Sequence, residues 1–231
     1  MPQGKEVTME SINGAHLYCA DGKTYPSVTT ILSIVAYSQQ LMKWANSLGM
    51  RRIDYQTELD RTAVQGTYVH EINQCLVDPE NGKMPTIGDP LTEYRVRKRV
   101  ANFKSKLDEH DGHWSTIFSE KPFVSHTYEI GGTMDWGANW YDKVTLFDYK
   151  TSAAVRDKHV LQLGGYNLML HDNGIDIDQG GIILCKEDRC IFNIFDKETL
   201  DKAADIFLSI YDYYKKHDWL ANVILNGATT I

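Results

Sequence analysis

The segment VTLFDYK, residues 144–150, constrains the fold more than any other part of the chain. Side chains alternate between the two faces of a strand, so Val144 and Leu146 share a face with Asp148 and Lys150. The opposite face is also largely apolar, which predicts an interior strand of a sheet. Charged side chains at the end of an apolar face need a partner, a metal or a site. The segment therefore predicts a functional site at the C-terminal end of an interior strand.

The flanking segments add polar side chains that can reach the same place. Asp135 lies in the extended run that precedes this strand, and Gln162 and Tyr166 lie in a predicted helix that follows it. Residues four apart on a helix are neighbours on one face. Carboxylates that converge from neighbouring strands are suitable ligands for a hard divalent cation such as Mg2+. These residues together predict a metal site beside a lysine.

The order of these residues resembles a known family. Asp135, the Asp-x-Lys pattern at 148–150 and the Gln-x-x-x-Tyr pattern at 162–166 resemble the PD-(D/E)xK nuclease superfamily. The segments GTYVH, residues 66–70, and QLGGY are similar to those of its RecB-like exonuclease branch. YPSVTTIL, residues 25–32, resembles the phage exonucleases and the mitochondrial genome-maintenance exonuclease of that branch. The resemblance covers most of the chain.

The resemblance implies an α/β fold of the restriction-endonuclease-like kind, with a mixed central sheet flanked by helices. We expect a single nuclease domain over residues 1–231. Within it, residues 1–110 form a mostly helical N-terminal part, and residues 114–231 form the catalytic sheet and its helices. Among the N-terminal helices, one is expected to begin near Asp60 or Thr62. In the helix expected over residues 91–110, the residues predicted roughly on the buried side are Leu91, Tyr94, Val96, Val100, Phe103 and Leu107.

The same resemblance assigns roles to individual residues. The residues implied as catalytic are Asp135, Asp148, Lys150, Gln162 and Tyr166. The implied metal ligands are His70, Glu120, Asp135, Asp148 and the carbonyl of Tyr149. The implied DNA contacts are Ser27, Thr29, Arg97, Lys98 and Tyr166. Taken alone, Ser27 is a helix cap, and Glu120 is equally well explained as an edge-strand glutamate. Arg97 and Lys98 belong to a basic cluster that fits an exposed helix face and a phosphate-binding surface equally well.

The expected function is divalent-metal-dependent hydrolysis of DNA by an exonuclease, in recombination, repair or phage DNA processing. One or two Mg2+ or Mn2+ ions are the expected cofactors, and single- or double-stranded DNA ends are the expected substrate. Recombination or replication proteins are possible partners. The alternatives are a structure-specific endonuclease and a non-catalytic DNA-binding or assembly subunit. A simpler interpretation treats Asp148 and Lys150 as an ordinary ion pair at the end of a strand.

Composition limits the location and the other cofactors. The formal net charge of −7 does not exclude DNA, because phosphate binding depends on local patches. No apolar run approaches the roughly 20 residues of a membrane span, and the N-terminus lacks an apolar signal core. We therefore expect a cytoplasmic protein, in a bacterial or phage-infected cell, that is not secreted and has no membrane partner. The four cysteines are few and scattered for a disulfide framework. Some RecB-like nucleases hold an iron–sulfur cluster through one early and three late cysteines, and only two are late here, so no cluster is expected.

Overall fold

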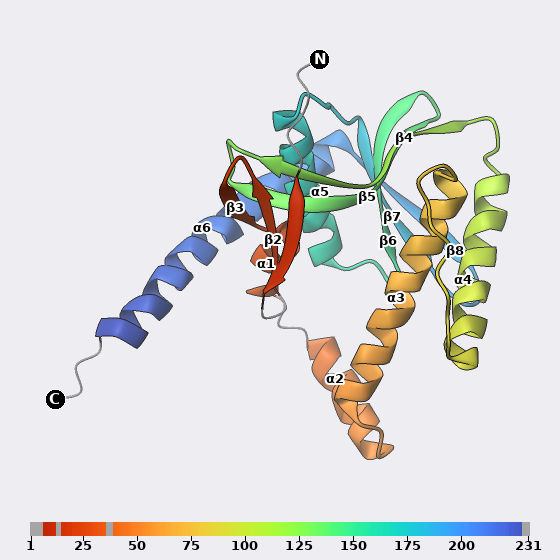
Figure 1. The fold of residues 1–231 in the computed structure, drawn as a ribbon, viewed down its shortest axis with the longest axis horizontal. Helices are drawn as coiled ribbons and strands as arrows, with labels where there is room; N and C mark the ends of the chain where they lie inside the picture. Colours follow the sequence, from red (N-terminus) through yellow and green to blue (C-terminus); the bar gives the residue numbers. More distant parts are fainter. Residues whose placement is uncertain (1–6, 13–14, 36–38, 228–231) are drawn as a thin grey trace.

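A five-stranded mixed sheet forms the centre of the molecule (Figure 1). The computed structural model describes residues 7–12, 15–35 and 39–227. The first three strands form an antiparallel meander, the fourth is parallel to the third, and the fifth returns antiparallel. In sheet order the strands are β4 (Trp114–Ser125), β5 (Ile130–Trp140), β6 (Lys143–Lys150), β7 (Gln179–Cys185) and β8 (Cys190–Asp196). The interior position predicted for residues 144–150 is confirmed.

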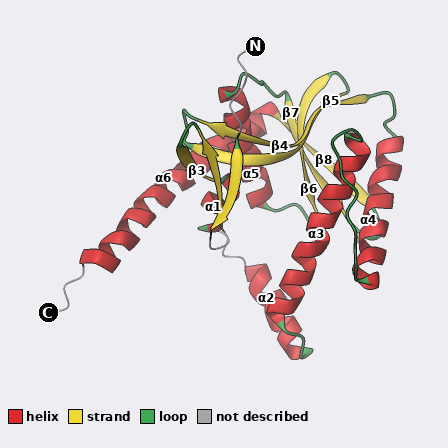
Figure 2. Ribbon diagram, viewed as in Figure 1, coloured by secondary structure: helices red, strands yellow, loops and turns green. Residues whose placement is uncertain are grey.

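Helices cover both faces of this sheet, which makes the fold mixed α/β as expected (Figure 2). Leu146 on β6 belongs to the core beneath one group of helices, whereas Phe147 belongs to the core beneath the other. The first group comprises α1 (Val28–Ser33), α5 (Asp157–Asp172) and α6 (Lys197–Gly227). The second comprises α3 (Tyr55–Val77) and α4 (Pro90–Asp108). Because successive side chains of β6 point to opposite faces of the sheet, they contribute to two separate hydrophobic cores.

The N-terminal part contains a small sheet as well as helices. Its three antiparallel strands are β1 (Thr8–Ile12), β2 (Ala15–Ala20) and β3 (Lys23–Pro26). Helix α2 (Gln39–Met50) then pairs with the first half of α3 to form an arm that projects from the body (Figure 1). Among the described residues, no helix combines the length and the apolarity needed to cross a bilayer.

Two details of the helices differ from the prediction. Helix α3 begins at Tyr55, because the Asp54 carboxylate accepts a hydrogen bond of 2.7 Å from the Thr57 amide and caps the helix. In α4 the buried stripe runs through Thr92, Val96, Phe103 and Leu107. Leu91 and Tyr94 lie off this stripe and are 52% and 56% exposed, so their predicted burial was wrong. Val96, Phe103 and Leu107, predicted on the same side, are buried, so the prediction failed only at the N-terminal end of the stripe.

The glycine pair in α5 permits close packing between helices. A Cβ atom on Gly164 would lie 2.5 Å from the backbone of Ala203 and Ala204 on α6. A Cβ atom on Gly165 would lie 2.9 Å from the side chain of Val28 on α1. The loss of helix propensity at two glycines is therefore offset by contact with α6 and α1. This packing fixes α5 against the sheet and positions Gln162.

Candidate metal and phosphate site

Three side chains from different elements converge at the centre of β4 and β5. His70 comes from α3, Glu120 from β4 and Asp135 from β5. The Nδ1 atom of His70 lies 3.5 Å from Oδ2 of Asp135 and 3.6 Å from Oε1 of Glu120. One ligand atom from each residue falls within 4.8 Å of the other two. This set of nitrogen and carboxylate donors, here called the acidic cluster, can hold a divalent cation.

An irregular backbone aims Glu120 at this cluster. Phe118 and Phe123 both contribute to the core beneath α5 and α6, although residues five apart on a regular strand face opposite sides. Between them, Glu120 has a φ of 44°, in the left-handed region that a glutamate rarely adopts. The pairing of β4 with β5 also shifts between Thr116 and Phe118. Such irregularities redirect side chains and are frequent beside functional sites.

The backbone of Tyr149 holds the other two members of the acidic cluster. Its amide donates a hydrogen bond of 2.7 Å to Oδ2 of Asp135, and its carbonyl oxygen lies 3.0 Å from Nε2 of His70. If Nε2 carries the proton and donates to this carbonyl, Nδ1 is left facing the two carboxylates. The Tyr149 carbonyl, predicted as a metal ligand, thus contacts His70 and orients its ring.

Asp148 and Lys150 occupy the adjacent end of β6. The Nζ atom of Lys150 lies 2.6 Å from Oδ2 of Asp148, whose side chain is 1% exposed. The amide Nε2 of Gln162, on α5, donates to Oδ1 of Asp148 at 2.9 Å and to the hydroxyl of Tyr166 at 3.0 Å. The predicted pairing of Gln162 with Tyr166 is confirmed. Asp148 therefore lies in a chain of contacts from α5 to Lys150, outside the acidic cluster.

The ionisation of these groups follows from burial and charge. Burial by itself lowers the pKa of His70, but the carboxylates of Asp135 and Glu120 outweigh it and hold that pKa well above the usual range. Burial by itself raises the pKa of Asp135, yet the charge and hydrogen bond of His70 bring it below the usual value. Burial raises the pKa of Glu120. Of the two carboxyl groups in the acidic cluster, Asp135 therefore ionises more readily.

Asp148 differs from Asp135 because it lacks the close contact with His70 that offsets the effect of burial on the pKa of Asp135. Burial raises the pKa of Asp148 to about 6, against the opposing charge of Lys150 and with the nearby charge of Asp135 adding to the rise. The buried surroundings that make Asp148 costly to ionise also strengthen the attraction between its charged form and the Lys150 ammonium. Perturbed pKa values of this kind cluster at functional sites.

A cleft of about 360 Å3 opens beside Lys150, between α1 and α5. Its polar lining includes Thr29 and Ser33 from α1 and Lys158, His159 and Gln162 from α5. The Arg156 amide donates to Nδ1 of His159, so the proton of the neutral ring is on Nε2, a donor. Burial lowers the pKa of His159 to about 3, with the nearby positive charges adding to the effect. Donors therefore predominate in this cleft, which suits an anion.

Sequence reasoning missed Lys158 and His159. They precede Gln162 by four and three residues on the same helix, so helical periodicity alone places all three on one side of α5. That spacing from a predicted site residue was the available signal.

The predicted DNA contacts lie in different environments. Thr29 lines the cleft, and Ser27 is 2% exposed and caps α1 by accepting from the Thr30 amide. Tyr166 is 4% exposed, and its hydroxyl accepts the hydrogen bond from Gln162. A direct contact of Ser27 or Tyr166 with a nucleotide stays a prediction. Lys98 lies on the exposed face of α4, with its Nζ atom 4.6 Å from the centre of the Tyr94 ring.

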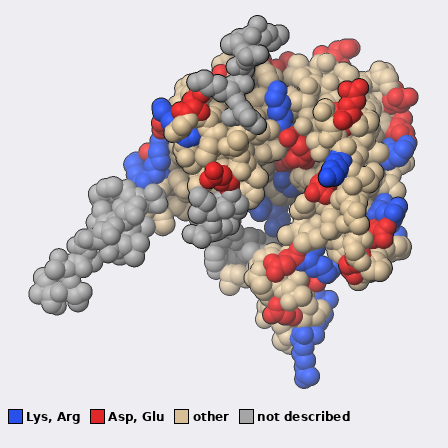
Figure 3. Space-filling model, viewed as in Figure 1, with Lys and Arg blue, Asp and Glu red and all other residues tan. Residues whose placement is uncertain are grey.

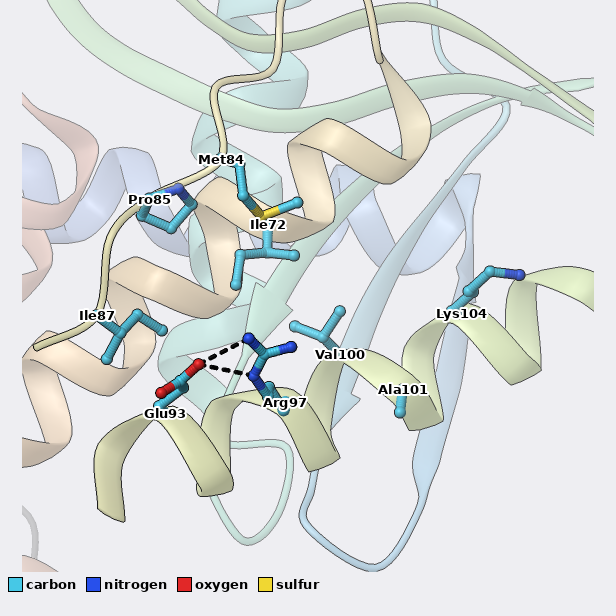
Figure 4. Close-up of a pocket in the computed structure, with 9 residues that line it drawn as sticks. All are labelled: Ile72, Met84, Pro85, Ile87, Glu93, Arg97, Val100, Ala101 and Lys104. Atoms are coloured by element: carbon cyan, nitrogen blue, oxygen red, sulfur yellow. Dashed lines mark hydrogen bonds and ion pairs between the residues drawn. The ribbon is translucent and has the colours of Figure 1, made fainter. Parts of the chain in front are cut away.

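Arg97 borders a separate, mostly apolar recess between α3 and α4 (Figure 4). There its guanidinium donates to the carboxylate of Glu93 at 2.7 and 2.9 Å. Two further lysines of the predicted basic cluster also pair with carboxylates on or next to the same helix, Lys104 with Asp108 and Lys106 with Glu109. Much of the positive charge of this helix is therefore balanced locally, which favours the interpretation as an exposed face.

The acidic cluster passes a chemical test for a divalent cation. Oε1 of Glu120 is buried and has no hydrogen-bond donor among the described residues. Bonds of 2.0–2.2 Å to a shared metal separate neighbouring ligand atoms by about 3.0–3.5 Å, close to the spacing around His70 Nδ1. A bound cation would take the place of the proton on Nδ1, because metal ligands must be deprotonated.

Comparisons with known proteins do not identify a family. No protein-family model matches the chain, and no curated protein matches it. Among solved structures, a chain described as "Crystal structure of SSO0001" is 14% identical, with a TM-score of 0.29. The match covers 65% of this chain and 70% of that chain. A likeness at this level carries no argument about fold or function.

Proposed function

We propose that the chain is a divalent-metal-dependent DNA exonuclease of the RecB-like branch of the PD-(D/E)xK nucleases. The observation that carries the proposal is the position of the acidic cluster beside the Asp148–Lys150 pair. Five sequence blocks that resemble this family contribute to that one region. Phosphodiester hydrolysis needs a group that activates water, a positive charge near phosphorus and a place for the strand. The adjoining cluster, lysine and cleft provide these three elements.

The acidic cluster would hold the metal through Nδ1 of His70 and the carboxylates of Glu120 and Asp135. A bound Mg2+ or Mn2+ supplies Lewis-acid activation of water and neutralises charge on the phosphate. The Tyr149 backbone keeps His70 and Asp135 oriented, since it contacts both. Support of this kind usually improves metal affinity, because the ligands do not have to reorganise on binding.

Lys150 would act on the phosphate and the attacking water. Asp148 holds its ammonium at 2.6 Å, and Gln162 holds Asp148 from the other side. An ammonium fixed next to the acidic cluster stabilises the negative charge that develops on phosphate oxygens. It can also orient the water that attacks. Gln162 and Tyr166 are then positioning residues that act through Asp148.

The cleft beside Lys150 would accept the phosphate backbone of the strand. Thr29, Lys158 and His159 present donors to it without a carboxylate among the polar lining. A cytoplasmic role in recombination, repair or phage DNA processing, with partner proteins from those processes, belongs to the same proposal.

The test is cleavage of 5′- and 3′-labelled DNA, single- and double-stranded, linear and circular. Each substrate is incubated with Mg2+, Mn2+ or EDTA, beside the Lys150→Ala variant. We expect metal-dependent loss of linear DNA, intact circles and no activity in the variant. The variant should retain thermal stabilisation by Mn2+, because the acidic cluster is unchanged.

Other outcomes redirect or refute the proposal. Cut circles would make the protein an endonuclease. A folded protein that binds metal and DNA but cleaves neither form would be a binding or assembly subunit. Full activity of Lys150→Ala would exclude the proposed site.

A further inference from the structure

The arm formed by α2 and α3 ends in a basic and apolar tip, here defined as Met50, Arg51 and Arg52. Met50 is 80% exposed, and both arginines are exposed. Lysine and arginine side chains are visible at the free end of the arm (Figure 3). Met50 therefore adds an apolar surface beside the two positive charges. The tip is therefore a candidate for a contact with another molecule.

The backbone at the tip would be more stable with a different residue. The Ile53 amide donates to Leu48 and the Arg52 amide to Gly49, which is the hydrogen-bond pattern of a Schellman motif. Arg52 occupies the left-handed position of that motif with a φ of 57°. Glycine is the favoured residue there, because a Cβ atom is disfavoured in this conformation. An arginine at a position that suits glycine indicates that the side chain is needed for something other than folding.

The positive charges of the tip are available to a ligand. Among the residues that the structure describes, neither Arg51 nor Arg52 takes part in an ion pair. The nearest acids in sequence have other roles: Asp54 caps α3, Glu58 pairs with Arg61, and Asp60 accepts from Gln56. The Nε atom of Arg51 donates to the Ser47 carbonyl at 3.3 Å. Two guanidinium groups without a carboxylate partner among the described residues, at the end of a projecting arm, suit a polyanion.

Helix α3 sets the distance between the tip and the acidic cluster. It starts at Tyr55, three residues after Arg52, and carries His70 fifteen residues later. At about 1.5 Å per residue, this part of the helix is about 22 Å long. Base pairs are stacked about 3.4 Å apart, so the same length corresponds to about 6–7 base pairs of duplex.

We propose that the tip binds the phosphate backbone of duplex DNA about 6–7 base pairs from the scissile phosphate. Arg51 and Arg52 each contact a phosphate, and Met50 supplies an apolar contact to the sugars beside them. The inference rests on the proposed nuclease function and adds a second contact, outside the catalytic region, that depends on substrate length. It makes duplex extension beyond the site a determinant of affinity.

The experiment measures DNA affinity in EDTA, which prevents cleavage, with duplexes of about 5, 10 and 20 base pairs. The Arg51→Ala/Arg52→Gly variant is compared with wild type at several salt concentrations. Wild type should bind the two longer duplexes more tightly than the shortest. The variant should lose that gain, and its salt slope on the longest duplex should fall by about 1.8, or 0.9 for each phosphate contact. On the shortest duplex the two proteins should bind equally.

Two controls separate charge and folding from the specific contact. Lys202→Ala/Lys216→Ala removes two exposed charges from α6 and should leave the length dependence unchanged. Arg51→Lys/Arg52→Lys keeps the charge and should retain most of the salt slope. The glycine at position 52 relieves the left-handed strain, so the first variant should melt no lower than wild type.

The results also distinguish this inference from the proposed function. Equal length dependence and salt slope in wild type and the tip variant would refute the inference, even if wild type cleaves DNA. Equal loss of affinity on all three duplexes would refute it as well, because the tip would then act on the site itself. A wild-type protein that neither binds nor cleaves DNA would refute both proposals.

Discussion

The two sides of the site carry opposite chemistry and are assembled in different ways. The acidic cluster brings together one residue each from α3, β4 and β5, and it depends on the irregular backbone at Glu120. The lysine side consists of Asp148 and Lys150 on one strand and Lys158, His159 and Gln162 on one helix. The first side suits a cation and the second an anion. The difference indicates that metal binding and phosphate binding can be separated by mutation.

The largest expected effect is the loss of cleavage in Lys150→Ala and in Asp135→Asn. Each should reduce the rate by at least about 10²–10⁴-fold, because each removes a group proposed to act on the reacting atoms. The two should differ in thermal stabilisation by Mn2+, which Lys150→Ala keeps and Asp135→Asn loses. Calorimetry with and without Mn2+ measures this. Loss of stabilisation in both variants would mean that the two sides are not separable.

The next effect concerns metal affinity alone. Glu120→Gln should raise the Mn2+ concentration for half-maximal cleavage by about 10–100-fold, with much of the rate recovered at saturation. The matched variant Glu120→Gly removes the carboxylate and suits the left-handed backbone, so it should weaken metal binding without lowering the metal-free melting temperature. Titration of cleavage with Mn2+ tests both. Unchanged half-saturation in both variants would exclude Glu120 as a ligand.

A smaller effect is expected from the contacts that support Lys150. Gln162→Ala leaves the Asp148 carboxylate and the Tyr166 hydroxyl without their shared donor. Buried groups that lose a partner cost about 1–3 kcal/mol, which corresponds to a fall of several degrees in the melting temperature. Tyr166→Phe keeps the bond to Asp148 and should have less effect on both stability and cleavage. Equal losses in the two variants would show that the bond from Gln162 to the Tyr166 hydroxyl, rather than the bond to Asp148, matters.

The smallest effect concerns pH and His159. Its pKa is about 3 in the folded protein, and about 6.5 is usual in an unfolded chain. The unfolded state therefore binds the proton more readily, so the contribution of His159 to stability is present above pH 6.5 and is lost as the pH falls toward 3. From pH 7 to pH 5, wild type should lose up to about 2 kcal/mol more stability than His159→Gln. Denaturant unfolding at both pH values, with exposed His171→Gln as the control, measures the difference. Parallel losses in wild type and His159→Gln would contradict the assignment.

Local periodicity predicted part of the lysine side, although Lys158 and His159 were missed. Period-2 alternation placed Asp148 and Lys150 on one face of an interior strand, and helical spacing paired Gln162 with Tyr166. Both rules need only the residues within one regular element. The same rules predicted the burial of Val96, Phe103 and Leu107 in α4 correctly but failed for Leu91 and Tyr94. Burial there is decided by how the helix sits on the sheet, which a single helix does not specify.

The acidic cluster required the tertiary structure. His70, Glu120 and Asp135 were named individually from family resemblance, but no spacing rule brings α3 to the centre of β4 and β5. Period-2 alternation describes regular strands, whereas Glu120 is aimed by a residue with positive φ. The chain by itself therefore determined which strands and helices form and which face of each is polar, because those properties arise from neighbouring residues. Only the packing of α3 against the irregular strands decided which three donors meet, because that depends on contacts between distant segments.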